Sequence, residues 1–216
     1  MPADRTMMET GRHRTISAGP DGLPAWRYSP PVLRGAAVTL REVRLEDAVA
    51  LRSVLCADDV AQFIEPPPAT VLAFERYIRW AHEQRAEGLS VTFAMLTESS
   101  TTPVGLFHLR AMEPGFGVAD WQFAIGSAFW GQGLFFTAAP LLLQFAFETI
   151  GVRRVEARAA VRNGRGNGAL RKLGAVQEAL LRQSLVRGGM SFDQVLWAIL
   201  ADDWRSRGPV GFGLVH

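Results

Sequence analysis

Apolar and polar residues alternate in regular patterns from residue 37 onward, and the period of the pattern changes along the chain. Alternation with a period of two is typical of strands that bury one face. It predicts strands at residues 38–43, 89–97, 104–110, 118–126, 152–161, 177–187 and 191–200. Apolar residues at helical spacing predict helices over residues 45–55, 70–86 and 133–149, and a short helix that ends near Gly174. This order of elements predicts an α/β (α+β) fold with a mixed sheet and helices on both of its faces.

The beginning of the chain differs from the rest. It is rich in Gly, Pro, Arg, Ser and Thr and lacks a sustained apolar period, so we expect residues 1–31 to form a flexible arm, poorly ordered or loosely packed. The length of 216 residues suits one ordinary domain with such an arm. We therefore expect a single domain over residues 32–205 and a short tail over residues 206–216.

Composition and charge narrow the class of protein. Apolar residues make up 48% of the chain and charged residues 20%, which is enough for a packed core and excludes wholesale disorder. The formal net charge of +2 gives no broad positive field, so we expect neither nucleic acid nor a membrane as partner. The single Cys56 and four scattered histidines offer no metal-ligand spacing, so we expect no metal.

The sequence also gives an expectation for location. The longest apolar run, residues 135–147, contains Pro140 and Gln144 and is too short to span a bilayer. The N-terminus shows no apolar stretch of the kind found in secretory signals. We therefore expect a cytoplasmic protein, as a monomer or a homodimer.

Two glycine-rich segments follow predicted strands and precede predicted helices. In residues 129–135, glycines let the main chain approach a ligand, and the free N–H groups at the start of a helix suit a pyrophosphate. The alternative is a tight turn without a ligand. Residues 163–169 fit the spacing of a dinucleotide-binding fingerprint. However, the stretch from there to Gly174 is too short for the crossover helix of that fold, which disfavours it.

The two segments lie about thirty residues apart, with an amphipathic helix between them. Several short motifs accompany them: Leu40-Arg41-Glu42, Val104-Gly105, Ala119-Asp120-Trp121-Gln122-Phe123, Phe129-Trp130-Gly131-Gln132-Gly133-Leu134, Asn163, Arg171-Lys172-Leu173-Gly174-Ala175 and Asp193-Gln194-Val195-Leu196. With these motifs the sequence, from about Leu33 to Trp204, resembles the GNAT acetyltransferases, and most closely the branch of ribosomal-protein N-terminal acetyltransferases. The resemblance implies the GNAT fold, a mostly antiparallel sheet of six to seven strands whose central parallel pair splays apart.

The resemblance also implies an enzyme that moves an acetyl group from acetyl-CoA to a primary amine. The implied acceptor is a protein or peptide N-terminus, or a small-molecule amine. The alternative is a GNAT-fold protein that binds acyl-CoA as a sensor or scaffold and turns it over weakly or not at all. Two departures favour that alternative, because Leu170 stands where many relatives carry a Tyr acid and Gly166 where some carry a Ser. The sequence therefore names no general acid.

The resemblance places the pyrophosphate of CoA on the first glycine-rich segment, at Trp130, Gly131, Gln132, Gly133, Leu134 and Phe135. Gly133 matches the family's loop, Trp130 replaces an Arg or Gln, and Phe135 replaces a small residue close to the phosphates. Main-chain N–H groups can still bind the anion there, because they do not depend on the side chains.

The resemblance makes residues 118–126 and 152–161 the parallel pair, with the pantetheine arm lying between them like an added strand. Its expected partners are the exposed main-chain groups of Ala124, Ile125 and Gly126. We expect Asn163 and Asn167 on the cofactor side as well. For Asn163 the alternative is to cap the following helix, which Asn does well.

Alternation along the central strands selects the candidate base. Asp120 falls on the face opposite the apolar side chains of its strand, and polar groups there are costly unless they line a wet cleft or pair with one another. We expect Asp120 to act as the base or to hold a water, with Glu156 second and His108 third. For Glu156 the alternative is a structural ion pair with Arg158.

Overall fold

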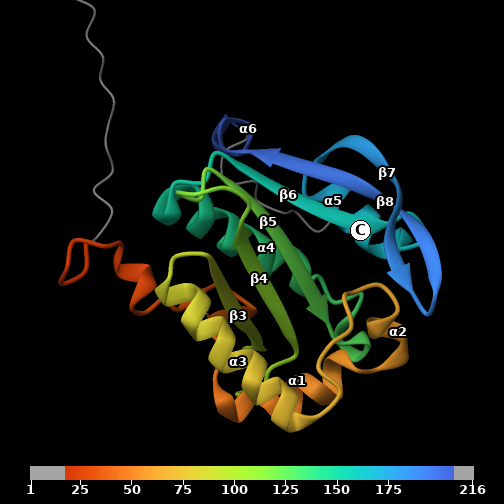
Figure 1. The fold of residues 1–216 in the computed structure, drawn as a ribbon, viewed down its shortest axis with the longest axis horizontal. Helices are drawn as coiled ribbons and strands as arrows, with labels where there is room; N and C mark the ends of the chain where they lie inside the picture. The colour runs from red at the N-terminus through yellow and green to blue at the C-terminus, as the bar shows by residue number, and fades with distance from the viewer. Residues whose placement is uncertain (1–17, 207–216) are drawn as a thin grey trace, which may run out of the picture.

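The computed structural model describes residues 18–206, which form an eight-stranded sheet between helices (Figure 1). The strands are β1 (Leu33–Arg34), β2 (Val38–Glu42), β3 (Ser90–Thr97), β4 (Gly105–Ala111), β5 (Val118–Ile125), β6 (Arg154–Ala160), β7 (Val176–Arg187) and β8 (Met190–Leu200). Their order in the sheet is β1-β2-β3-β4-β5-β6-β8-β7. Among these described strands β5 and β6 are parallel neighbours, and the other neighbouring pairs are antiparallel.

Helices cover both faces of the sheet. On one face lie α1 (Ala48–Leu55) and α3 (Val71–Ala86), and on the other lies α4 (Leu134–Gln144), which continues as a π-helix over Phe145–Ile150 (Figure 1). The shorter elements are η1 (Ala25–Arg27), η2 (Leu45–Asp47), α2 (Asp58–Ala61), η3 (Ser127–Phe129), α5 (Gly164–Lys172) and α6 (Ala201–Ser206). The mixed sheet with helices on both faces, predicted from the sequence, is confirmed.

Alternation along the strands divides the buried side chains into two cores. Phe93 of β3 and Phe107 of β4 are fully buried in the core under α4, together with Leu142. The next residue, Ala94, belongs to a second core with Phe74 of α3. Because side chains of a strand point alternately to opposite faces, the two cores show which residues reach the face covered by α1 and α3.

The strand count is eight rather than the predicted six to seven because of β1, which pairs Leu33 with Leu40 and Arg34 with Thr39. Two residues are too few for an alternating pattern, so β1 has no signature in the sequence. The predicted helix over residues 45–55 is divided into η2 and α1.

Part of the expected N-terminal arm belongs to the described structure. Residues 1–17, and residues 207–216 of the expected tail, lie outside the described residues. In the segment 18–31, Trp26 is buried and stands edge-on to Phe116, with 5.6 Å between the ring centroids. This contact attaches the segment to the core under α4. No helix in the described part of the chain has the length and hydropathy to cross a bilayer.

Strands β5 and β6 separate soon after they begin to run side by side. Their pairing covers Val118 opposite Arg154, Ala119 opposite Val155, and Asp120 opposite Glu156. Beyond this last pair the two strands diverge, as Figure 1 shows, while β5 continues to pair with β4 as far as Ile125. The predicted parallel pair is confirmed, and the sheet opens between its two members.

Candidate active site

The candidate catalytic side chains meet where β5 and β6 separate. Asp120 and Glu156 form the last pair between these strands. Both point to the face covered by α1 and α3, because the preceding residues Ala119 and Val155 belong to the opposite core. The opening between the strands therefore begins directly beside two carboxylates.

Asp120 is a buried carboxylate with two polar neighbours. Its side chain is 6% exposed, and Oδ2 accepts hydrogen bonds from Gln122 Nε2 at 3.3 Å and from Arg110 Nη2 at 3.4 Å. Burial raises the pKa of Asp120, although the charges of Arg110 and Arg158 and the hydrogen bond from Gln122 act in the opposite direction. A carboxylate with a raised pKa is a stronger base, so this environment suits proton abstraction.

Glu156 is held in an ion-pair network. Its Oε1 accepts a hydrogen bond from Arg154 Nε at 2.8 Å, and the other nitrogens of Arg154 bind Glu178 at 2.8 and 2.5 Å. The two carboxylates raise the pKa of Arg154, and Arg154 lowers the pKa of Glu178. The partner of Glu156 is therefore Arg154, not the Arg158 considered from the sequence. A carboxylate committed to this network is less available as a base than Asp120.

His108 of β4 lies on the same face, but its surroundings keep it neutral. Burial and the charge of Arg110 lower the pKa of His108 to about 4. Its Nδ1 is 2.8 Å from Thr92 Oγ1. Trp80 of α3 stacks on the imidazole, with 6.4 Å between the centroids. A neutral ring covered in this way is a weak base.

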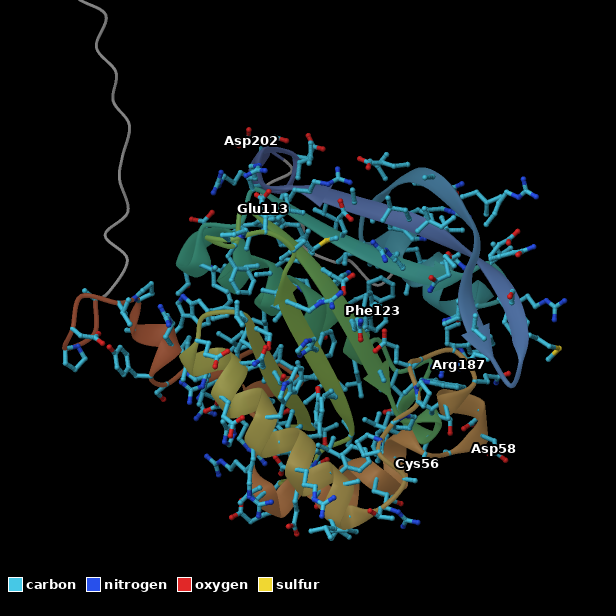
Figure 2. The ribbon with its side chains drawn as sticks, in the orientation of Figure 1. Cys56, Asp58, Glu113, Phe123, Arg187 and Asp202 are labelled. Atoms are coloured by element: carbon cyan, nitrogen blue, oxygen red, sulfur yellow. The ribbon has the colours of Figure 1, made fainter. Side chains whose placement is uncertain are left out.

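The open edge of β5 presents main-chain groups to the gap. The N–H of Gly126 donates to the Val104 carbonyl at 2.9 Å, which directs Gly126 toward β4. Because these groups alternate along a strand, Ala124 also faces β4, whereas Phe123 and Ile125 face the gap. Ala124 and Gly126 thus direct their main-chain groups toward β4, and of the three expected partners Ile125 alone faces the gap. Figure 2 shows Phe123 on β5, near the centre of the molecule.

The loop before α4 has the form of an anion cradle. Gly131 and Gly133 have φ angles of +76° and +74°, a conformation that favours glycine, and a Cβ at either position would meet open space. Within residues 18–206 the main-chain N–H groups of Gly131, Gln132 and Gly133 have no hydrogen-bond acceptor. They stand at the N-terminus of α4, where the helix dipole favours negative charge.

The Phe135 ring does not occupy this loop. It is buried under the sheet, with its centroid 4.5 Å from that of Phe123 and 6.1 Å from that of Trp121. The resemblance put the large Phe135 side chain close to the phosphates, but this side chain instead packs into the core under α4.

Asn163 and Asn167 have structural partners. Asn163 Oδ1 accepts a hydrogen bond from the Gly166 N–H at 2.8 Å and so caps α5. Asn167 is buried, donates to the Ala160 carbonyl at 2.8 Å and accepts from Trp197 Nε1 at 2.9 Å. The bonds of Asn167 join α5 to β6 and β8. Both asparagine side chains thus have hydrogen-bond partners within the protein.

Two side chains of this site belong to no motif in the sequence. Arg110 lies opposite Asp120 on β4, and Thr92 lies opposite His108 on β3. Alternation within each strand places all four on one face, but their contacts depend on the register between strands. Alternation in the sequence could therefore have placed Arg110 and Thr92 on the same face as Asp120 and His108, but not in contact with them.

Comparison with known proteins assigns the chain to a family. A model of the acetyltransferase (GNAT) domain matches residues 37–176, more than half of the chain. The chain belongs to the GNAT acetyltransferase family. This agrees with the resemblance seen in the sequence.

Individual relatives are distant. The chain is 23% identical over 168 residues to the uncharacterized N-acetyltransferase p20 of Bacillus licheniformis, which covers 77% of this chain and 94% of that protein. It is similar to the structure of RimL, a ribosomal L7/L12 alpha-N-protein acetyltransferase in complex with coenzyme A, with a TM-score of 0.73, 16% identity and coverage of 80% of this chain and 99% of that one. A ribosomal-protein-S5-alanine acetyltransferase from Vibrio fischeri gives the same TM-score of 0.73 at 18% identity, with coverage of 81% and 99%. At these identities the two structures establish the fold alone.

Family membership makes this protein an acetyl-CoA-dependent N-acetyltransferase. The described residues fit that donor, because three unpaired amides at a helix N-terminus and an opened strand pair match a diphosphate and an extended amide chain. The described residues contain no cluster of His, Cys, Asp or Glu suited to hold a metal ion.

Proposed function

We propose that this GNAT protein acetylates the α-amino group of a protein or peptide by direct attack on the thioester, with Asp120 as the base. The observation that supports the proposal is the position of Asp120, a buried carboxylate with a raised pKa at the point where β5 and β6 diverge. A small-molecule amine is the second class of acceptor.

In this proposal the donor lies along the gap between the strands. The amides of Gly131, Gln132 and Gly133 bind its diphosphate. The N–H and carbonyl of Phe123 and the N–H of Ile125 bind the pantetheine amides as a neighbouring strand would, while the Ile125 carbonyl accepts a hydrogen bond from Trp130. The thioester then lies toward Asp120. The N–H of Phe123 faces the gap on the same strand and is suited to stabilise the negative charge that develops on the carbonyl oxygen.

The chemical step needs one base and one proton for the leaving group. Asp120 takes a proton from the ammonium form of the acceptor, directly or through a water, and the free amine attacks the thioester carbonyl. A C–N bond forms, the C–S bond breaks, and the proton lost by the attacking nitrogen ends on the thiolate of CoA.

Proton affinity favours an α-amino acceptor over a lysine side chain. At pH 7 an α-amino group, with a pKa near ~8, is far closer to neutrality than a lysine with a pKa near ~10.4. A single carboxylate such as Asp120 can complete the first deprotonation more easily than the second. Of the two ribosomal-protein acetyltransferases that share the fold, RimL is named as an alpha-N-protein acetyltransferase.

The test mixes the purified protein with acetyl-CoA, a thiol reagent and a panel of amines. We expect CoA release with peptides that carry a free α-amino group, and little release with the same peptides blocked at the N-terminus and containing an internal lysine. Release with small amines but with no peptide would move the assignment to the second acceptor class. Calorimetric binding of acetyl-CoA without release on any amine would instead support the sensor or scaffold.

A further inference from the structure

A side-chain contact joins the two glycine-rich segments. Arg165, in the first turn of α5, places its guanidinium carbon 3.7 Å from the centroid of the Trp130 ring. Trp130 lies between η3 and α4, in the turn that follows β5, whereas Arg165 lies at the start of α5, which follows β6. The contact therefore connects the two sides of the gap between these strands.

Trp130 is a fixed platform. Its Nε1 donates a hydrogen bond to the Ile125 carbonyl at 2.7 Å, and its ring packs against both hydrophobic cores. The unpaired amides of Gly131, Gln132 and Gly133 follow it directly in the chain. A guanidinium stacked on this indole is thus held next to the anion cradle.

The charge of Arg165 is not neutralised by the protein. Unlike Arg154, which binds Glu156 and Glu178, the exposed Arg165 has no ion-pair partner among the described residues. Stacking uses the flat face of a guanidinium and leaves the N–H donors at its edge free. That edge matches two oxygens of a phosphate group.

We propose that Arg165, stacked on Trp130, binds the diphosphate of the acyl-CoA donor together with the amides of the loop before α4. This inference rests on the proposed function, since it assumes that CoA is the ligand of the cradle. Trp130 stands where related loops carry an Arg or Gln, and Arg165 supplies a cation to the same place from the other side of the gap. The stacked pair also connects the segments that follow β5 and β6, and the donor lies between these strands in the proposed binding mode.

The test is calorimetric binding of CoA and of dephospho-CoA, which lacks the 3′-phosphate, to the full chain. Arg165→Gln should weaken both ligands by about tenfold, because it removes one charge-assisted, bidentate contact to a group that both ligands share. Arg171→Gln is the matched control, since Arg171 is also on α5 and stands 6.0 Å from the Trp197 ring, away from the cradle. It should leave both dissociation constants unchanged.

Salt provides a second readout. Added NaCl should weaken CoA binding to the wild type more steeply than to Arg165→Gln, because the variant lacks one screened contact. Weakening confined to CoA would place Arg165 on the 3′-phosphate and overturn the diphosphate assignment. Equal affinities for wild type and Arg165→Gln would remove Arg165 from donor binding but leave the proposed function intact. Failure of the wild type itself to bind CoA would instead contradict the proposed function.

Discussion

Asp47 holds Arg41 through two hydrogen bonds, from Nη1 to Oδ2 and from Nη2 to Oδ1, each 2.7 Å long. Oδ2 also accepts the Arg44 main-chain N–H at 2.8 Å. The side chains of Arg41 and Asp47 are 13% and 4% exposed. One buried carboxylate therefore fixes the end of β2 to η2, from which α1 continues, and Arg41 of the Leu40-Arg41-Glu42 motif has a structural role.

Replacing Asp47 by Ala should lower the free energy of unfolding by about 3 kcal/mol, because it leaves a mostly buried guanidinium without its partner. Urea unfolding followed by circular dichroism measures the change. Glu75→Gln is the control, since its pair with Arg79 is exposed and should contribute less than about 0.5 kcal/mol. Equal losses in the two variants would contradict the role given to Asp47.

Asp120→Asn should lower kcat by about a hundredfold at pH 7, as expected for the loss of a general base. Its dissociation constant for acetyl-CoA should stay within about twofold of wild type, because the proposed donor contacts use other residues. Between pH 7 and 9 the variant should recover relative to wild type, since an α-amino group with a pKa near ~8 then loses its proton to water. Steady-state kinetics across this range, with Glu156→Gln for comparison, measures both effects. An unchanged kcat would remove Asp120 from the mechanism.

The lowered pKa of His108 predicts a pH-dependent stability. Between its ordinary value of 6.5 and its folded value of about 4, the unfolded chain takes up a proton at His108 and the folded protein does not. The free energy of unfolding should therefore fall as the pH falls through this window, by up to about 3 kcal/mol, and the contribution is complete above it. Urea unfolding at a series of pH values should give a steeper decline for wild type than for His108→Gln. Parallel curves would show that the ring is not held neutral.

Replacing Asn163 separates its two possible roles. Asn163→Ala should lower the free energy of unfolding by about 1 kcal/mol through loss of the cap on α5, and Asn163→Ser should restore most of it because Ser also caps helices. Calorimetry should show the same affinity for acetyl-CoA in both variants and in wild type. A loss of affinity in Asn163→Ser, with stability preserved, would instead place the side chain against the donor.

Much of this arrangement follows from alternation within single strands. The period of two placed Asp120 on the polar face of its strand, and the structure confirms that face. Alternation alone does not identify the partner of Glu156, because Arg154 and Arg158 are each two residues from Glu156 and lie on the same side of β6. The choice of Arg154 depends on Glu178, which comes from β7 and completes the network.

The main-chain partners of the donor could not be predicted in the same way. Side-chain alternation does not show whether a residue directs its N–H and carbonyl groups to one neighbouring strand or the other. That depends on register, here on the bond from Gly126 to Val104. Likewise the pairing of Arg110 with Asp120 joins residues on two strands, and the hydrophobic pattern contains no information on how they align.

The early end of pairing between β5 and β6 has a consequence for the catalytic cycle. Two strand edges in the middle of a sheet have main-chain groups that a folded protein normally satisfies from within. In the proposed binding mode, acetyl-CoA fills this opening and supplies the hydrogen bonds that a neighbouring strand would give, and these bonds are lost when CoA leaves. Donor occupancy in this mode should therefore strengthen the link between the strands from β1 to β5 and the strands β6, β8 and β7.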